Sequence, residues 1–516
     1  MQTCKRKVKE TRKTITQISL FTEGKVIASA EQGQSVPMCE ALQRRLAKRS
    51  TYALERTLSQ AMMEEITSHQ NLLRSYRRVV SNGGSAGTEG MQTKELKNWL
   101  RTNYTNLREQ LMSGTYRPQG VKGVEIPKPN GGKRQLGIPT VVDRFVQQAI
   151  AQVMTRQYEP AFSEHRALLN KYRFCKYKRL AFNNITSRKL YQINNAEHSY
   201  GFRPHRNCWQ ALQQATSVIS EGKSYVIDLD LEKFFDEVNH DRLMSRLSKR
   251  IGDKRVLKLI RLFLQSGIMQ GGVICQRIKG TPQGSPLSPL LSNIVLDELD
   301  RELESRQLKF VRYADDVKIF AGSKKAATRI KETVTHYIES KLLLKVNQQK
   351  SRICRGYELN FLGHCLLYDK QVGSGKESET KLKAKVRYIT HRNRGISFTR
   401  MVKEVNQILR GWHEYFRYAA MQTKIQKIDG WIKRRLRCFR LKQCKRVIGM
   451  VRFLRKEGVE EKLSWKTALS GKGWWRLSNT PATNMAMNDF WFAKEGYYSL
   501  SANYKRLKLC ETAVCV

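Results

Sequence analysis

The chain contains 516 residues, which at roughly 100–200 residues per domain suggests about three or four domains. Lysine and arginine number 95, aspartate and glutamate number 45, and the formal net charge is +50. Repulsion among so many like charges destabilises a compact chain unless something anionic is bound, so nucleic acid is the expected partner. Hydrophobic residues make up 40% of the sequence, which argues against wholesale disorder. An uncharged apolar run of about 18 residues, which a basic membrane protein would need, is absent.

The cysteines and the N-terminal segment give no sign of secretion or of a zinc module. The eleven cysteines are scattered, and no two have the C-x-x-C spacing of a zinc ribbon or a thioredoxin-like site. We therefore expect free, reduced thiols. Residues 1–55 are polar and basic, do not have the pattern of a signal peptide, and are interpreted as a basic N-terminal extension. A cytoplasmic location follows as the default expectation.

Helical periodicity begins after this extension. Apolar spacing predicts a helix over 61–80, and a Gly- and Ser-rich loop over 81–87 ends it. A second helix is predicted over 96–112, before the chain changes to strand-like patterns.

A hairpin and an insertion follow. Residues 124–128 and 133–138 are predicted to form two strands joined by a turn of Pro, Asn and Gly residues, and a helix is predicted over 143–158. Residues 166–198 are rich in Lys, Arg, Asn and Tyr and have no clear period. We interpret them as an inserted loop.

Two segments are predicted to present carboxylates at the ends of strands. The apolar run over 225–229 predicts a buried strand that delivers Asp230 at its C-terminal end. Residues 310–320 alternate on both sides of Asp315 and Asp316, which predicts a hairpin with adjacent aspartates at its tip. Two such carboxylates could not both be buried without a cation.

These carboxylates predict a magnesium site. Mg²⁺ prefers carboxylate and phosphate oxygens, and a two-metal site needs carboxylates from separate elements, which Asp230, Asp315 and Asp316 can supply. Asp228 lies two residues before Asp230 and would point to the same face of a strand, so it is an alternative ligand.

The C-terminal part is more basic. Residues 431–455 hold ten lysines or arginines and no acidic residue. On a helix these cations would cover much of the circumference and neutralise phosphates without reading bases. Four aromatic residues further on fit either a core or base stacking, and the sequence does not separate the two: Trp474, Trp475, Trp491 and Tyr497.

Taken together, these motifs resemble a group II intron-encoded reverse transcriptase. Residues 313–316, Tyr-Ala-Asp-Asp, are similar to the catalytic signature of that family. The other blocks occur in the family's order: Ile126-Pro127-Lys128-Pro129, Gln135-Leu136-Gly137-Ile138-Pro139-Thr140, Tyr200-Gly201-Phe202-Arg203-Pro204, Asp230-Leu231-Glu232-Lys233-Phe234-Phe235-Asp236 and Thr281-Pro282-Gln283-Gly284. Ser285 departs from the pattern, since the family usually has Gly there. The subtype resembles the compact bacterial class C enzymes that lack an endonuclease domain.

The resemblance implies an α+β, right-handed polymerase fold. Fingers and a palm with an antiparallel sheet would be followed by an α-helical thumb, or maturase domain, and a small DNA-binding region. The expected divisions are 1–55 (basic extension), 56–220 (N-terminal region and fingers, with the insert 166–198), 221–370 (palm), 371–455 (thumb) and 456–516 (DNA-binding region).

The resemblance also implies roles for single residues. Asp230, Asp315 and Asp316 would be catalytic and would hold two Mg²⁺ ions. The family motif favours Asp230 over Asp228 because of the five-residue spacing between Asp230 and Phe235. Lys128 and Arg134 would clamp the incoming triphosphate, a task that suits the bidentate geometry of arginine. Phe235 would exclude a ribose 2′-OH, Gln283 would line the nucleotide pocket, and Lys350 would be a general acid. The RNA-binding residues would be Lys433, Arg434, Arg435, Arg437 and Arg440.

The implied function is RNA-directed DNA synthesis for intron mobility combined with maturase action on the parent intron RNA. The implied partners are group II intron RNA, a DNA target and primer, and dNTPs, in a bacterial cytoplasm with association to the nucleoid. Two alternatives stay open from the sequence: a splicing-only maturase with a disabled polymerase, and a domesticated bacterial reverse transcriptase.

Overall fold

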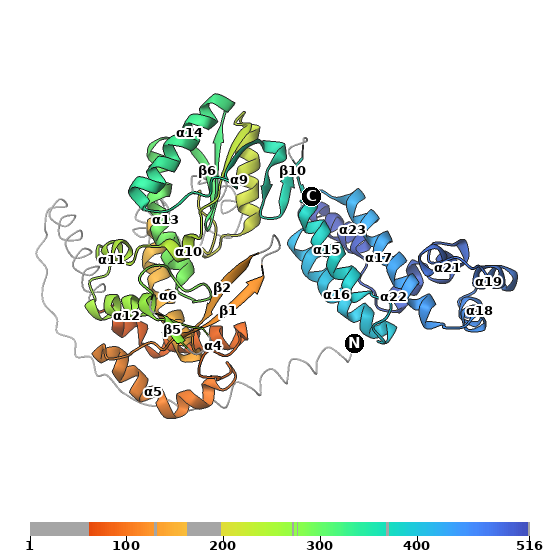
Figure 1. Ribbon diagram of the computed structural model, residues 1–516, viewed down its shortest axis with the longest axis horizontal. Coiled ribbons are helices and arrows are strands. Elements are labelled where there is room, and N and C mark those ends of the chain that lie inside the picture. The colour runs from red at the N-terminus through yellow and green to blue at the C-terminus, as the bar shows by residue number, and fades with distance from the viewer. Residues whose placement is uncertain are drawn as a thin grey trace, which may run out of the picture. The chain divides into compact units, whose positions relative to one another are not determined.

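A computed structural model describes residues 61–127, 132–162, 198–270, 273–275, 277–367 and 371–513 (Figure 1). The chain divides into two units, Met1–Leu58 and Ser59–Val516, and all that follows concerns the second. The basic extension, Lys128 and the insert 166–198 up to residue 197 lie outside the described residues. Within the described ranges, no helix combines the length and apolar character needed to cross a bilayer.

The first predicted helix is two helices. Ser68 adopts an extended backbone (ψ 141°), and the hydroxyl of Thr67 donates to the carbonyl of Met63 at 2.9 Å, so the chain bends between them. The prediction of one helix over 61–80 was therefore wrong at 67–68, because side-chain hydroxyls compete there for helical carbonyls. The prediction over 96–112 is confirmed. The helices are α3 (Met62–Ile66), α4 (His69–Asn82) and α5 (Leu96–Ser113).

The predicted hairpin forms, and it belongs to a larger sheet. Its strands are antiparallel with Val124 opposite Leu136, and the first also pairs in parallel with a strand more than 130 residues away by sequence. The sheet has the order β2-β1-β4-β5. Its strands and the helix that follows the hairpin are β1 (Val121–Pro127), β2 (Lys133–Ile138), β4 (Ile268–Gln270), β5 (Val273–Cys275) and α6 (Val141–Phe162).

A second four-stranded sheet forms the expected palm, with antiparallel strands in the order β6-β7-β3-β8. Ile227 and Ile319 face the core shared with α13 and α14, whereas Val226 and Phe320 face the core shared with α9. Helices thus cover both faces (Figure 1). The elements are β3 (Tyr225–Leu229), β6 (Lys309–Tyr313), β7 (Asp316–Ala321), β8 (Arg352–Arg355), α9 (Cys208–Ser220), α13 (Ser288–Ser305) and α14 (Lys324–Tyr337).

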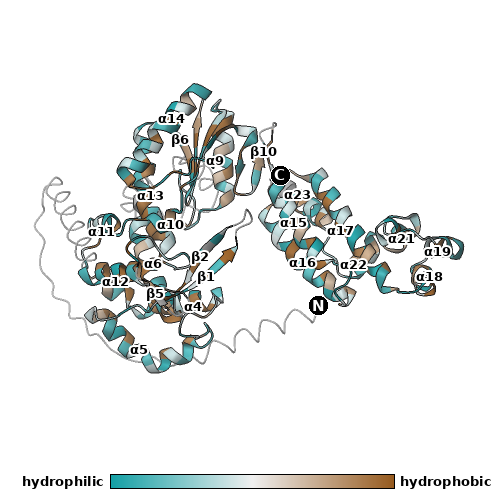
Figure 2. Ribbon diagram, in the orientation of Figure 1, coloured by the Kyte–Doolittle hydropathy of each residue, from teal (hydrophilic) through white to brown (hydrophobic). Residues whose placement is uncertain are grey.

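Shorter elements connect the palm sheet to its surroundings. A three-stranded sheet of order β11-β10-β9 follows β8. Figure 2 shows hydrophobic residues along the strands around β6 and largely hydrophilic residues on α14. The remaining elements are α10 (Phe234–Glu237), α11 (His240–Ser248), α12 (Lys254–Gln265), η1 (Ile338–Leu342), η2 (Gly356–Glu358), β9 (Asn360–Phe361), β10 (His364–Leu366) and β11 (Val372–Ser374).

The C-terminal region is helical and has one shared core. Its buried cluster runs from Leu382 to Tyr504 and includes Trp491 and Tyr497, so these two aromatic residues are core residues. The basic stretch 431–455 spans two helices, since Lys445 between them has a left-handed backbone with φ 57°. The helices are α15 (Lys376–Ile389), α16 (Phe398–Tyr415), α17 (Gln422–Gln443), α18 (Val447–Lys456), α19 (Glu461–Ala468), α20 (Trp474–Leu477), α21 (Pro481–Ala486), α22 (Asp489–Lys494) and α23 (Leu500–Ala513).

Candidate active site

Asp315 and Asp316 lie where β6 turns into β7. Tyr313 pairs with Asp316 across the hairpin, which leaves Ala314 and Asp315 as the turn residues. Ala314 has a left-handed backbone with φ 59°, a conformation common in two-residue hairpin turns. The tight turn therefore carries both aspartates, and both side chains are half-buried.

The guanidinium of Arg312 supports this turn from inside the fold. It is 1% exposed, and Nε and Nη2 donate to the two carboxylate oxygens of Asp300 at 2.7 and 2.5 Å. Nη1 donates to Asn293 Oδ1 at 2.9 Å and to the carbonyl of Ala314 at 3.0 Å. The bonds of Arg312 to Asp300 and Asn293 were not predicted from the sequence, because Asp300 and Asn293 reach the turn only through the packing of α13.

The Tyr200-Gly201 block packs against the same turn. The amide of Tyr200 donates to the carbonyl of Arg312 at 2.9 Å, and Asn293 Nδ2 donates to the carbonyl of Gly201 at 2.9 Å. A Cβ on residue 201 would lie 2.2 Å from the amide nitrogen of Ala314, closer than atoms can approach. Glycine is therefore required there, and this motif positions the turn between β6 and β7 by backbone contact.

Asp230 follows β3 and is held by the segment that carries Lys350. The amide of Asp230 donates to Ser351 Oγ at 3.1 Å, and its carbonyl accepts from the amide of Asn347 at 2.8 Å. Lys350 Nζ lies 3.8 Å from Asp230 Oδ2. Leu229 of β3 pairs with Val317 of β7. Because the two strands are antiparallel, the next residue after β3, Asp230, comes opposite Asp316 at the start of β7. The sheet thus brings the three predicted carboxylates to one edge.

The carboxylates influence one another. Burial raises the pKa of Asp230, Lys350 opposes this, and the charges of Asp315 and Asp228 raise it further. Burial also raises the pKa of Asp316, against the opposing charge of Lys318. Like charges held together in this way attract a cation, and carboxylate oxygens are the donors that Mg²⁺ prefers.

The donor set fits divalent cations, but the side chains would have to move to hold one. Among the described residues, no three His, Cys, Asp or Glu side chains are grouped closely enough to hold an ion as they stand. Instead the ammonium of Lys318 forms ion pairs with Asp316 and with Asp228. Neither this lysine nor its role was predicted, and its only sequence signal is a charged residue within an otherwise apolar strand.

The other described residues that were predicted at the nucleotide site are Phe235, Gln283 and Arg134. Phe235 is half-buried and packs edge-on against Phe234, with 5.3 Å between ring centroids. The carbonyl of Phe235 accepts from the amide of Thr281 at 2.6 Å, and the carbonyl of Gln283 accepts from the amide of Gly137 at 2.9 Å. These bonds join the 281–284 turn to the Phe235 segment and to the hairpin. Arg134 lies on β2 opposite Ile126.

Ser285, the departure from the family pattern, is built into the fold. Its hydroxyl donates to Gln147 Oε1 at 2.6 Å and accepts from the amide of Leu287 at 3.2 Å. The side chain is buried, and the left-handed residue of the turn is Gly284 with φ 116°. A serine is tolerated because residue 285 itself needs no left-handed backbone.

The predicted RNA-binding cations of α17 are engaged within the protein. Arg434 donates to the carbonyl of Trp475 at 2.9 Å and lies 4.1 Å above its ring, and Arg437 donates to the carbonyl of Met487 at 2.8 Å. Arg435 donates to Thr390 Oγ1 at 2.6 Å, and Arg440 lies 4.6 Å above the ring of Phe453.

Lys433 differs from its neighbours, because its Nζ lies 3.2 Å from Asp429 Oδ2 and 2.7 Å from Asp489 Oδ1. The expectation of a helix without acidic partners is wrong for this residue, since Asp429 precedes the basic stretch and Asp489 follows it in sequence.

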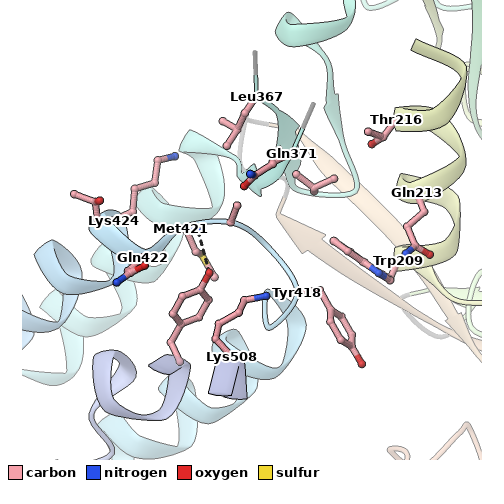
Figure 3. A pocket seen from close by; sticks show the side chains of 14 residues that line it. Trp209, Gln213, Thr216, Leu367, Gln371, Tyr418, Met421, Gln422, Lys424 and Lys508 are labelled. Carbon is pink, nitrogen blue, oxygen red and sulfur yellow. Dashed lines mark hydrogen bonds between the residues drawn. The ribbon is translucent and has the colours of Figure 1, made fainter. Parts of the chain in front are cut away.

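A cavity of about 730 Å³ lies away from the carboxylates, beside α9 and the C-terminal helices (Figure 3). The rings of Trp209 and Tyr418 are 5.2 Å apart at its edge, and Lys424 and Lys508 supply positive charge. Amide and hydroxyl groups and apolar side chains make up the rest of the lining: Gln213, Thr216, Gln371, Gln422, Thr423, Leu367, Val372, Ala420, Met421 and Tyr504. No sequence motif pointed to it.

Comparison with known proteins gives two family matches. Residues 160–366 match the reverse transcriptase (RNA-dependent DNA polymerase) family, and residues 380–458 match the group II intron maturase-specific domain. Protein YkfC of Escherichia coli (strain K12) is 30% identical over 349 residues, which are 60% of this chain and 83% of that protein.

Two intron proteins are also similar. The group II intron-encoded protein LtrA of Lactococcus lactis subsp. cremoris is 28% identical over 287 residues, or 54% of this chain and 42% of LtrA. The putative COX1/OXI3 intron 1 protein of Saccharomyces cerevisiae (strain ATCC 204508 / S288c) is 25% identical over 350 residues, 57% of this chain and 38% of that protein. The chain spans less than half of these two relatives. With its polymerase domain and its maturase domain, the chain belongs to the group II intron-encoded reverse transcriptase and maturase family.

Proposed function

We propose that the protein is an RNA-directed DNA polymerase encoded by a group II intron, which copies intron RNA into DNA during retrohoming and assists splicing of the same RNA. The observation that carries this proposal is the convergence of Asp230, Asp315 and Asp316 at one edge of the sheet. A protein that only assists splicing would not need three carboxylates brought together at this position.

The chemistry assigned to this site is attack of a primer 3′-OH on the α-phosphate of a dNTP. Two Mg²⁺ ions bound by Asp230, Asp315 and Asp316 would lower the pKa of that hydroxyl and stabilise the departing pyrophosphate. Lys350, which is 64% exposed and lies beside Asp230, would protonate the pyrophosphate. Lys128 and Arg134 would hold the triphosphate, and this assignment rests on the family motif.

The proposed RNA contact combines α17 with the cavity. Carbonyl oxygens and aromatic rings orient the guanidinium groups of Arg434, Arg435, Arg437 and Arg440 without neutralising them, so their charge stays available to phosphates. The paired rings of Trp209 and Tyr418 would add stacking for unpaired bases.

The proposed divisions follow the family. Residues 56–220 would form the N-terminal region and fingers, 221–370 the palm, 371–455 the thumb and 456–516 the DNA-binding region. Group II intron RNA, a DNA target with its primer, and dNTPs would be the partners, in the cytoplasm of a bacterium and at its nucleoid.

Primer extension on an RNA template tests the polymerase. Asp315→Asn or Asp316→Asn removes a catalytic carboxylate charge and should reduce extension to below a few percent of the wild type. Binding of intron RNA and assisted splicing should remain, because neither aspartate touches α17. If the wild type supports splicing but extends no primer, the splicing-only alternative is correct; if the variants extend normally, the catalytic assignment is wrong.

A further inference from the structure

Lys318 is an unexpected cation at the base of the candidate active site. It lies on β7 directly opposite Asp228 on β3, and its ammonium pairs with both Asp228 and Asp316. The side chain is only 3% exposed, and Nζ also lies 5.6 Å from the ring centroid of Phe361. A buried, flexible lysine held by two carboxylates is strongly constrained.

The charged groups around Lys318 come from the strands β3, β7 and β8 of the palm sheet. Asp228 has a second, looser partner, since Arg352 Nε lies 3.7 Å from its other oxygen and the Arg352 side chain is 54% exposed. Lys318 is therefore the cation shared between a residue assigned to metal binding and one that is not.

We infer that Lys318 is a positioning residue that acts through Asp316: its ammonium takes the place of a divalent cation on that carboxylate, and Asp228 retains the ammonium when an ion displaces it. This inference rests on the proposed function, because it assigns Asp316 to the metal site. It assigns Asp228 a task as well, which is to hold the displaced lysine rather than to bind metal.

The arrangement has a physical rationale. Carboxylates held close together repel one another when no cation is present, and a permanent ammonium between them relieves that repulsion. The same ammonium competes with the entering ion for Asp316. Removing the ammonium of Lys318 should therefore tighten binding of a divalent cation. Removing the carboxylate of Asp228 leaves the ammonium paired with Asp316 alone and should weaken binding of the divalent cation.

Binding of Mn²⁺ to the full chain without nucleic acid, followed by electron paramagnetic resonance, measures this competition apart from catalysis. The signal that disappears in Asp316→Asn reports the site. Lys318→Met should bind Mn²⁺ about 10-fold more tightly than the wild type, and Asp228→Asn several-fold more weakly. Asp228→Asn keeps the test available if loss of the buried lysine prevents folding.

Two controls separate competition from a general change of charge. Arg352→Met also removes a positive charge beside Asp228 but does not touch Asp316, so it should change the affinity less than about twofold. The double variant Asp228→Asn, Lys318→Met has the net charge of the wild type but leaves Asp316 free. It should still bind Mn²⁺ more tightly than the wild type.

The outcomes distinguish this inference from the proposed function. If the double variant has wild-type affinity, or if Lys318→Met and Arg352→Met act alike, net charge explains the data and the inference is overturned while the polymerase assignment stands. If the wild type shows no Asp316-dependent Mn²⁺ binding and extends no primer, the proposed function fails and takes the inference with it.

Discussion

The palm sheet and the C-terminal helices hold some of their cations with different partners. In the palm, Arg312 and Lys318 are almost fully buried, and both are paired with carboxylates. In the C-terminal helices, Arg434 and Arg437 donate to main-chain carbonyl oxygens and lie over aromatic rings. The carboxylates in the palm neutralise their cations, whereas the carbonyl oxygens and aromatic rings in the helices only orient the guanidinium groups.

This difference matches the two tasks proposed for the regions. The backbone that carries the carboxylates must keep a fixed geometry, and an ion pair beneath it holds that backbone without adding net charge. A surface for RNA needs oriented cations whose charge is not already used. Among the described residues, none of Arg434, Arg435, Arg437 and Arg440 forms an ion pair with a carboxylate.

One cation in the helical region, Lys433, is paired with a carboxylate, as the buried cations of the palm are. Asp429 is buried on α17, pairs with Lys433, and accepts hydrogen bonds from the hydroxyls of Tyr497 and Ser499 at 2.8 and 2.9 Å. These bonds join α17 to the segment before α23. Carboxylate pairing is therefore used in both regions where two elements must be held together.

Removal of a neutralised cation should have the largest effect. Arg312→Leu leaves Asp300 buried and unpaired and should lower the free energy of unfolding by about 3–5 kcal/mol, with loss of primer extension. Arg437→Leu, the matched change in the helices, loses carbonyl hydrogen bonds and the contact with the ring of Phe492 but leaves no carboxylate unpaired, and it should cost about 1–2 kcal/mol. Urea titrations of both variants make the measurement, and equal losses would remove the distinction between the regions.

Among the described residues, the buried carboxylate of Asp143 forms no ion pair, and we expect its contribution to stability to fall as pH rises. Asp143 accepts from Tyr116, Thr140 and the amide of Gln119, and burial raises its pKa to about 6. Because the folded state holds the proton more tightly than the unfolded state, stability from this group is present below about pH 4 and is lost as pH rises through 6. The loss is about 3 kcal/mol.

Asp143→Asn isolates this effect. The wild type minus variant difference in unfolding free energy should fall by up to about 3 kcal/mol between pH 4 and pH 7, because only the wild type titrates. Denaturant titrations at several pH values measure it. A difference that does not change with pH would mean that Asp143 keeps an ordinary pKa.

The unneutralised cations of α17 should control the salt dependence of RNA binding. Replacing Arg434, Arg435 and Arg437 by Ala should flatten the slope of log affinity against log salt by up to about two to three units. Removal of the exposed Lys324, Lys325 and Arg329 of α14 takes away the same charge elsewhere and should leave the slope nearly unchanged. Equal slopes in both triple variants would move the RNA contact away from α17.

A variant of the palm should change the choice of nucleotide without changing the salt dependence of RNA binding. Phe235→Ala removes the bulk expected to meet a 2′-OH and should raise the use of ribonucleotides relative to dNTPs by about 10-fold. The salt dependence of RNA binding should not change, since Phe235 packs in the palm core. An unchanged nucleotide ratio in single-turnover extension would show that Phe235 is only a core residue.

Much of the palm could be predicted because its motifs are local. Apolar alternation around Asp315 and Asp316 specifies a hairpin, and an apolar run before Asp230 specifies a strand end, so the carboxylates are placed by residues next to them in sequence. The basic stretch of α17 was likewise visible as a helical region. Its division at Lys445 was not, because a left-handed residue other than Gly leaves no signal.

The partners of the charged groups were decided by packing between distant segments. Arg312 meets Asp300, Lys318 meets Asp228, and Arg437 meets the carbonyl of Met487 only after helices and strands have assembled. A linear pattern specifies which face a residue occupies, through periods of 3.6 or 2, but it carries no information about which buried group lies opposite. Local sequence therefore places the carboxylates at one end of the palm strands, and tertiary contacts decide which cations pair with carboxylates and which are held by carbonyl oxygens and aromatic rings.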